Sequence, residues 1–152
     1  MLSNLFPLLA AIFAAVSAQL VKPLFHYLFE HEWDLGKIFD SGGFPSSHTA
    51  MVTALTIAIG IVEGIDSSLF AVILVFSLIV CYDAANVRYY AGKNIQITQQ
   101  LIKDIQDLTQ TQLNDPIYLT KIKDILGHKW IEVFGGLLWG ALTAGLCYLF
   151  LY

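Results

Sequence analysis

The sequence predicts an all-α integral membrane protein: a bundle of about four transmembrane helices plus a surface amphipathic helix in the third loop. Of its 152 residues, 57% are hydrophobic and 13% are charged, whereas a soluble domain carries roughly 25% charged residues. The mean hydropathy is +0.65. Four apolar stretches approach the ~20 residues that cross a bilayer core. A chain of this length predicts a single domain over residues 1–152.

The first apolar stretch predicts a helix from about Leu5 to Phe29. It has no basic residue before Lys22, so it lacks the basic start of a signal peptide, and we expect it to stay in the mature protein. Pro23 predicts a kink near the end of this helix, because proline removes a backbone donor and clashes with the preceding turn.

Three further apolar stretches predict the remaining spans. They run from about Ser46 to Val62, from about Leu69 to Tyr90, and from Lys129 or Trp130 to Leu151. The last contains the pattern Gly136-x3-Gly140-x3-Ala144. Small residues at this spacing are typical of closely packed membrane helices, so this face is a candidate homodimer contact.

Residues 91–127 form the one long polar region. Its first part predicts an amphipathic helix near the membrane surface, because apolar residues recur there mostly at i, i+3 and i+4: Ile95, Leu101, Ile102, Ile105 and Leu108. Asn114-Asp-Pro116 predicts the end of that helix, and a short helix through Ile122 and Ile125 should follow, with a turn at Gly127.

The charges predict the topology and exclude some functions. With four spans, all eight basic residues fall in the first and third loops: Lys22, Lys37, Arg88, Lys93, Lys103, Lys121, Lys123 and Lys129. The positive-inside rule then places these loops in the cytoplasm and both termini outside. The net charge is −4 and no basic stripe is present, so nucleic-acid binding is not expected. Cys81 and Cys147 lie in apolar segments and indicate packing rather than a disulfide.

The chemistry centres on residues 41–48, Ser-Gly-Gly-Phe-Pro-Ser-Ser-His. Gly42 and Gly43 allow close approach of the backbone to a ligand. A helix that begins here offers free N–H groups and the positive end of its dipole to an anion such as phosphate. Ser46 and Ser47 add hydroxyl groups, and His48 can hold or give a proton. The alternative is a glycine–proline turn with serine as an ordinary N-cap.

The four-span arrangement brings further polar residues to the same end of the bundle: Lys22, Asp83, Arg88, His128 and Glu132. Two histidines beside cations suit phosphoryl transfer through a phosphohistidine, in which one imidazole attacks phosphorus and the other protonates the leaving oxygen. His128 and Glu132 are four residues apart on one helix face, so the carboxylate can hold the far N–H of the imidazole.

Simpler interpretations exist for each residue. Lys22 could snorkel to the interface, Asp83 could serve only as the ion-pair partner of Arg88, and His128 with Glu132 could form a capping pair. Asp83, His128 and Glu132 could also bind a metal, although they show no recognisable ligand spacing.

Three blocks resemble a known family: Ser41-Gly-Gly-Phe-Pro-Ser-Ser-His48-Thr, Tyr82-Asp-Ala-Ala-Asn-Val-Arg88 with Gly92, and Leu126-Gly-His-x3-Glu132-Val-x-Gly135-x4-Gly140. Together they are similar to the small divergent membrane branch of the type 2 phosphatidic acid phosphatase and vanadium haloperoxidase superfamily. The resemblance implies cofactor-free and metal-free hydrolysis of lipid phosphates. It assigns His128 as nucleophile, Glu132 as its orienting partner and His48 as general acid. Ser46 and Ser47 would lie near the phosphate, and Lys22 would be the lysine of the first block.

The chain departs from the superfamily pattern at defined positions. The first block lacks its Arg-Pro, and Ile122 stands where an arginine usually precedes the third-block histidine. Arg88 would then supply that charge. The expected function is a membrane lipid phosphatase acting on a substrate of the phosphatidic acid, phosphatidylglycerophosphate or isoprenoid diphosphate type. The alternatives are a non-catalytic binder or transporter of phosphorylated lipid, and a metal-dependent phosphatase.

Overall fold

The computed structural model describes residues 5–110 and 128–151. Within these ranges the chain is helical and forms no strand. The elements are α1 (Phe6–Leu20), α2 (Lys22–Glu30), the 3-10 helix η2 (Leu35–Phe39), α3 (Ser47–Glu63), α4 (Ser68–Ala85), α5 (Val87–Thr109) and α6 (Trp130–Leu151).

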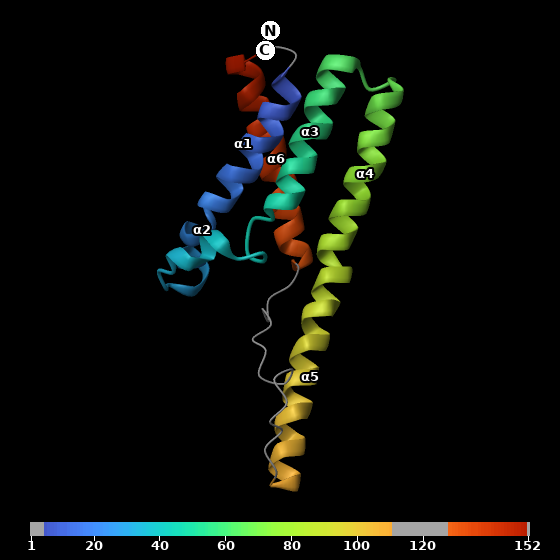
Figure 1. The fold of residues 1–152 in the computed structure, drawn as a ribbon. Coiled ribbons are helices and arrows are strands. Elements are labelled where there is room, and N and C mark those ends of the chain that lie inside the picture. The colour runs from blue at the N-terminus through green and yellow to red at the C-terminus, as the bar shows by residue number, and fades with distance from the viewer. Residues whose placement is uncertain (1–4, 111–127, 152) are drawn as a thin grey trace.

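The helices α1, α3, α4 and α6 form a bundle in which α3 contacts the other three (Figure 1). Three described helical stretches are long and apolar enough to cross a bilayer, namely Phe6–Glu30, Ser68–Thr109 and Trp130–Phe150, and Ser47–Glu63 is a shorter apolar helix. The predicted all-α membrane bundle is therefore confirmed.

The core of this bundle is built from small side chains. One cluster joins Ala14 and Ala18 of α1, Ala50 and Ala54 of α3, and Ala144 of α6, all with no exposed surface. Large apolar side chains such as Phe76, which is 61% exposed, point outward. Because lipid is as apolar as leucine, membrane helices associate through close packing and hydrogen bonds, and small residues permit that packing.

The small-residue face of α6 packs against α3 of the same chain. A Cβ added at Gly136 would lie 2.6 Å from the backbone oxygen of Ser46, and one at Gly140 would lie 2.4 Å from that of Ala50. This face is covered within the monomer, which corrects the idea that two copies dimerise through it.

The first predicted helix is divided into α1 and α2 at Val21. The break lies two residues before Pro23, as the proline predicts, because Pro23 has no N–H to continue the helical ladder. The Val21 N–H donates to the Ser17 oxygen at 3.1 Å, which closes α1. From this point α2 turns across the end of the bundle (Figure 1).

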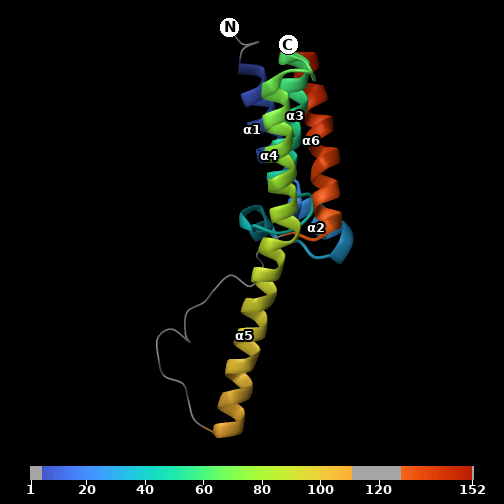
Figure 2. The same cartoon turned by 90° about the vertical axis from the view of Figure 1, so that its right-hand side faces the viewer.

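The amphipathic helix expected after the third span is present as α5, but it continues nearly in line with α4 and extends beyond the bundle (Figure 2). The hydrogen-bond ladder carries on through the break at Asn86. The Asn86 N–H donates to the Tyr82 carbonyl oxygen at 2.9 Å, and the Tyr90 N–H donates to the Asn86 carbonyl oxygen at 2.9 Å. Residues 83–91 contain neither glycine nor proline, so nothing in the sequence turns the chain here. The break predicted at Asn114-Asp-Pro116, the short helix after it and the turn at Gly127 lie outside the described residues.

Candidate functional site

The polar residues singled out in the sequence gather at the end of the bundle opposite the chain termini (Figure 1). They come from the start of α2, the glycine loop before α3, the end of α4 and the start of α6. The backbone itself links these elements, because the His128 N–H donates to the Ala84 oxygen at 2.9 Å and the Ser46 N–H donates to the Glu132 oxygen at 3.0 Å.

His128 is buried, and only one of its two ring nitrogens has a hydrogen-bond partner among the described residues. Its side chain is 1% exposed, and its Nδ1 lies 2.8 Å from Oε2 of Glu132. A carboxylate accepts hydrogen bonds, so in a neutral imidazole it would fix the proton on Nδ1 and leave the lone pair on Nε2. Nε2 is buried and has no hydrogen-bond partner among the described residues. Because buried polar atoms are nearly always paired, an unpaired one indicates a functional atom.

Glu132 is held in place by more than its histidine. Its Oε2 also accepts from the backbone N–H of Gly43 at 3.2 Å and from that of Lys129 at 3.3 Å. The side chain is 14% exposed. Two main-chain donors thus fix the carboxylate that orients His128, and one of them belongs to the glycine loop.

His48 faces His128 from the first turn of α3. The ring centroids are 6.2 Å apart and the ring planes meet at 64°. In-line transfer needs a nucleophile about 3–3.5 Å from phosphorus and an acid about 2.6–3.2 Å from the leaving oxygen. Along one line, these two distances and the phosphorus–oxygen bond between them exceed the 6.2 Å between the ring centroids. The two imidazoles therefore lie at one centre and must separate for a phosphorus atom to lie between them. His48 is exposed and His128 is buried, so they differ in access to water.

Ser46 is the N-cap of α3, as the simpler interpretation of the motif proposed. Its Oγ accepts from the Thr49 N–H at 3.3 Å and from the Thr49 hydroxyl at 3.1 Å, and the residue has no exposed surface. Pro45 precedes this cap rather than occupying the first turn of the helix. Ser47, the first residue of α3, is half-buried.

Lys22 is not a snorkelling residue. It is 2% exposed, and its Nζ donates to the carbonyl oxygens of Asp40 at 2.9 Å and Gly42 at 2.8 Å. An ammonium group has three donors, so one remains for a further acceptor. Gly42 is buried beside it, and Gly43 has φ +92°, a conformation that favours glycine.

Asp83 and Arg88 occupy the end of α4 and the first turn of α5. Asp83 is adjacent to Ala84, whose carbonyl binds the backbone of His128. The side chain of Arg88 lies outside the described part of the structure. No group of three His, Cys, Asp or Glu among the described residues could hold a metal ion. The ligand set of Asp83, His128 and Glu132 is therefore not assembled there.

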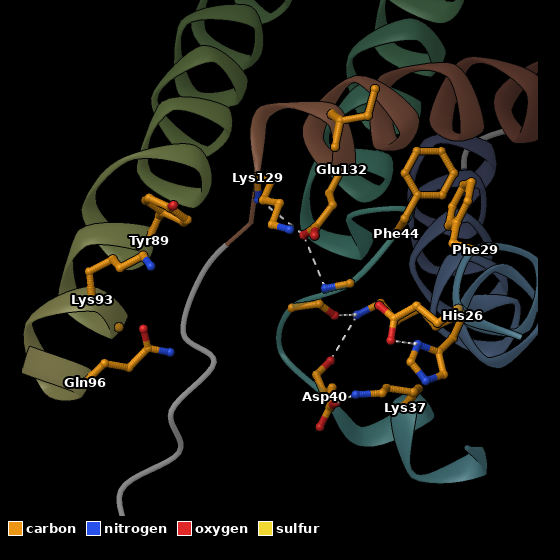
Figure 3. A pocket seen from close by; sticks show the side chains of 16 residues that line it. His26, Phe29, Lys37, Asp40, Phe44, Tyr89, Lys93, Gln96, Lys129 and Glu132 are labelled. Carbon is orange, nitrogen blue, oxygen red and sulfur yellow. Dashed lines mark hydrogen bonds and ion pairs between the residues drawn. The ribbon is translucent and has the colours of Figure 1, made fainter. Parts of the chain in front are cut away.

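A cavity of about 610 Å³ adjoins this centre (Figure 3). Lys22, Gly42, Gly43 and Glu132 line it, whereas His48 and His128 do not. Its other wall is α5, through Gly92 of the second sequence block and three residues that were not predicted as site residues: Tyr89, Lys93 and Gln96. Their i, i+3, i+4 and i+7 spacing marks one helix face. This spacing could indicate a cavity wall only if α5 were already known to continue in line with α4.

Comparison with known proteins identifies the family of the chain. A sequence family described as the divergent PAP2 family matches residues 3–143. The chain is also 37% identical over 152 residues to "Uncharacterized membrane protein YuiD" of Bacillus subtilis (strain 168), with 96% of each chain covered. No solved structure gives a significant match. The chain therefore belongs to the divergent PAP2 family.

Proposed function

We propose that this protein is a membrane lipid phosphatase that hydrolyses a phosphate monoester or diphosphate through a phosphohistidine on His128. The observation that carries the proposal is the state of the His128 ring. One nitrogen is fixed on Glu132 at 2.8 Å, and the other is buried with no partner among the residues that the structure describes, on a ring close to that of His48. A nucleophile oriented by a third group, with an acid beside it, is the usual signature of covalent catalysis.

The reaction balances in two steps. Nε2 of His128 forms a bond to phosphorus as the bond between phosphorus and the leaving oxygen breaks, and protonated His48 gives its proton to that oxygen. A water molecule then attacks phosphorus, His48 takes a proton from it, and the nitrogen–phosphorus bond breaks. Inorganic phosphate leaves, and both histidines return to their starting states.

The remaining groups stabilise the charge on the phosphoryl oxygens. Lys22 offers its third ammonium donor, and the N-terminus of α3 adds a positive dipole end. Arg88, in the first turn of α5, is the proposed second cation. Ser47 and Asp83 stay candidate contacts. We leave Ser46 out of the phosphate shell, because it caps α3 and has no exposed surface.

We place this site at the cytoplasmic face of the membrane, with the lipid as substrate. In the predicted four-span topology, all eight basic residues of the sequence fall in the first and third loops, which supports that orientation. A C-terminal reporter that is active only outside the cytoplasm should be active. A reporter that is inactive at the C-terminus, yet active when fused after the third span, would reverse the assignment.

The test is phosphate release by protein purified in detergent. The substrates are phosphatidic acid, phosphatidylglycerophosphate and an isoprenoid diphosphate. We expect His128→Ala and His48→Ala to abolish turnover. His31→Asn is the matched control, because His31 caps α2 with φ +58°, a conformation that asparagine tolerates, and lies outside the site.

The outcomes separate the competing functions. Loss of release in the two site variants but not in His31→Asn supports the proposal, as does a phosphorylated His128 trapped by rapid acid quench. Equal activity in all three variants would remove both histidines from the mechanism. Binding of phosphorylated lipid without any release would favour the non-catalytic binder or transporter.

A further inference from the structure

Lysines outnumber carboxylates in the lining of the cavity beside the histidine pair. Four lysines line it, Lys22, Lys37, Lys93 and Lys129, against three carboxylates, Glu30, Asp40 and Glu132. It meets the catalytic centre at Gly43 and Glu132, which belong to both. The cavity therefore adjoins the catalytic centre on the Glu132 side of the His128 ring, although neither histidine lines it.

Each carboxylate in the lining already has a partner. Glu132 holds His128, Asp40 pairs with Lys37 at 3.2 Å, and Glu30 pairs with His26 at 3.5 Å. Lys22 is committed to two carbonyl oxygens.

Lys93 and Lys129 are the two cations that remain. Neither forms an ion pair with a carboxylate in the described part of the chain. Lys93 projects from α5 toward the cavity, and Lys129 lies beside Glu132 at the start of α6 (Figure 3). Gln96, one turn beyond Lys93, adds an amide donor to the same wall. Together they form a cationic wall that faces the glycine loop.

We propose that Lys93 and Lys129 bind a second phosphate of the substrate, so that the substrate class is a lipid with two phosphates and the second lies on the lipid side of the bond that breaks. This inference rests on the proposed function. Lysine recognises phosphate as a point charge, which suits a group that is not itself transferred.

The rest of the cavity fits such a molecule. Its lining also contains the apolar side chains of Phe29, Phe44 and Ile131, and both Phe29 and Ile131 are 65% exposed. A chain that leaves the headgroup over these residues reaches the lipid-facing surface of the bundle. A substrate with one phosphate would fill the centre at His128 and leave both lysines without a counter-charge.

The experiment compares kcat/KM for two-phosphate lipids, phosphatidylglycerophosphate and an isoprenoid diphosphate, with kcat/KM for phosphatidic acid. The variants are Lys93→Gln and Lys129→Gln. Lys103→Gln is the matched control, because Lys103 is exposed on the same helix α5 and outside the cavity lining. We expect the wild type and Lys103→Gln to prefer two-phosphate lipids, and the preference to fall about tenfold in each cavity variant, the effect of one lost hydrogen bond to a charged group.

A binding measurement keeps this inference distinct from the proposed function. Calorimetry in detergent compares pyrophosphate with inorganic phosphate. Tighter binding of pyrophosphate in the wild type, lost in Lys93→Gln, supports the second subsite even if no lipid is hydrolysed. An unchanged lipid preference across all variants would overturn the inference, as would equal affinity for the two anions. If lipids are hydrolysed, pyrophosphate selectivity without a preference for two-phosphate lipids would also overturn it, because the subsite would then serve a free anion.

Discussion

Gly136→Ala tests whether the close approach of α6 to α3 positions the site. A Cβ at this position would lie 2.6 Å from the backbone oxygen of Ser46 and 2.7 Å from Cβ of Thr49. Both contacts are far inside the van der Waals distance of about 3.5–4.0 Å for carbon. One contact is to backbone, which cannot rotate away, so α6 and α3 must separate.

The magnitude follows from two opposing effects. Replacing glycine with alanine inside a helix gains up to about 1 kcal/mol of intrinsic helix stability. Overpacking a close interface costs about 1–3 kcal/mol. Gly145 isolates the first effect, because a Cβ there meets nothing within 4 Å. We therefore expect Gly136→Ala to be about 1–3 kcal/mol less stable than Gly145→Ala, although both changes add the same methyl group to the same helix.

The assay is thermal unfolding in detergent, where each kcal/mol corresponds to about 2–4 °C in Tm for a chain of this size. The same variants are then assayed for phosphate release below their Tm. Ser46 lies two residues before His48, so a displacement near 1 Å should lower turnover by roughly 10²-fold. If Gly136→Ala unfolds at the same temperature as Gly145→Ala or above it, the close packing of α6 on α3 is refuted.

Three further changes test individual residues. Glu132→Gln keeps the size of the side chain but removes the charge that fixes the His128 tautomer, so kcat measured on lipid phosphate should fall at least about 10²-fold; turnover at the wild-type level would contradict this. Ser46→Ala should lower the free energy of unfolding by about 1 kcal/mol through the lost N-cap; a fall in turnover beyond the fall in folded fraction would instead place its hydroxyl on the phosphate. Lys22→Met should weaken orthovanadate inhibition at least about tenfold, because it removes a charged donor; unchanged inhibition would limit Lys22 to tying the loop.

The sequence allowed prediction of the helices and of the end at which the chemistry gathers. Both follow from local rules: apolar length marks the spans, and alternating direction brings His48 and His128 to one face. The kink before Pro23 and the pairing of His128 with Glu132 at i, i+4 are also local, and both are present in the structure.

What the sequence did not predict depends on partners distant in the chain. The Gly136 face looked free for a second copy because nothing in the local pattern assigns it to α3. Lys22 was predicted at the site, but snorkelling stayed open as an alternative because its two carbonyl partners lie 18 and 20 residues away. The cavity required the direction of α5 relative to α4, which hydrophobic periodicity does not specify.

The glycines of α6 connect packing to chemistry. A Cβ at Gly135 would lie 2.2 Å from the ring of Phe44. The Phe44 ring therefore occupies the space that a side chain at position 135 would need. In the same way, the backbone oxygen of Ser46 occupies the space that a side chain at Gly136 would need. Glu132 is one turn toward the N-terminus of α6, and its carboxylate can reach the Gly43 N–H only if the loop containing Phe44 lies this close. The small residues that pack the helices therefore also bring the orienting carboxylate onto the glycine loop, so that stability and site geometry should change together in variants of this face.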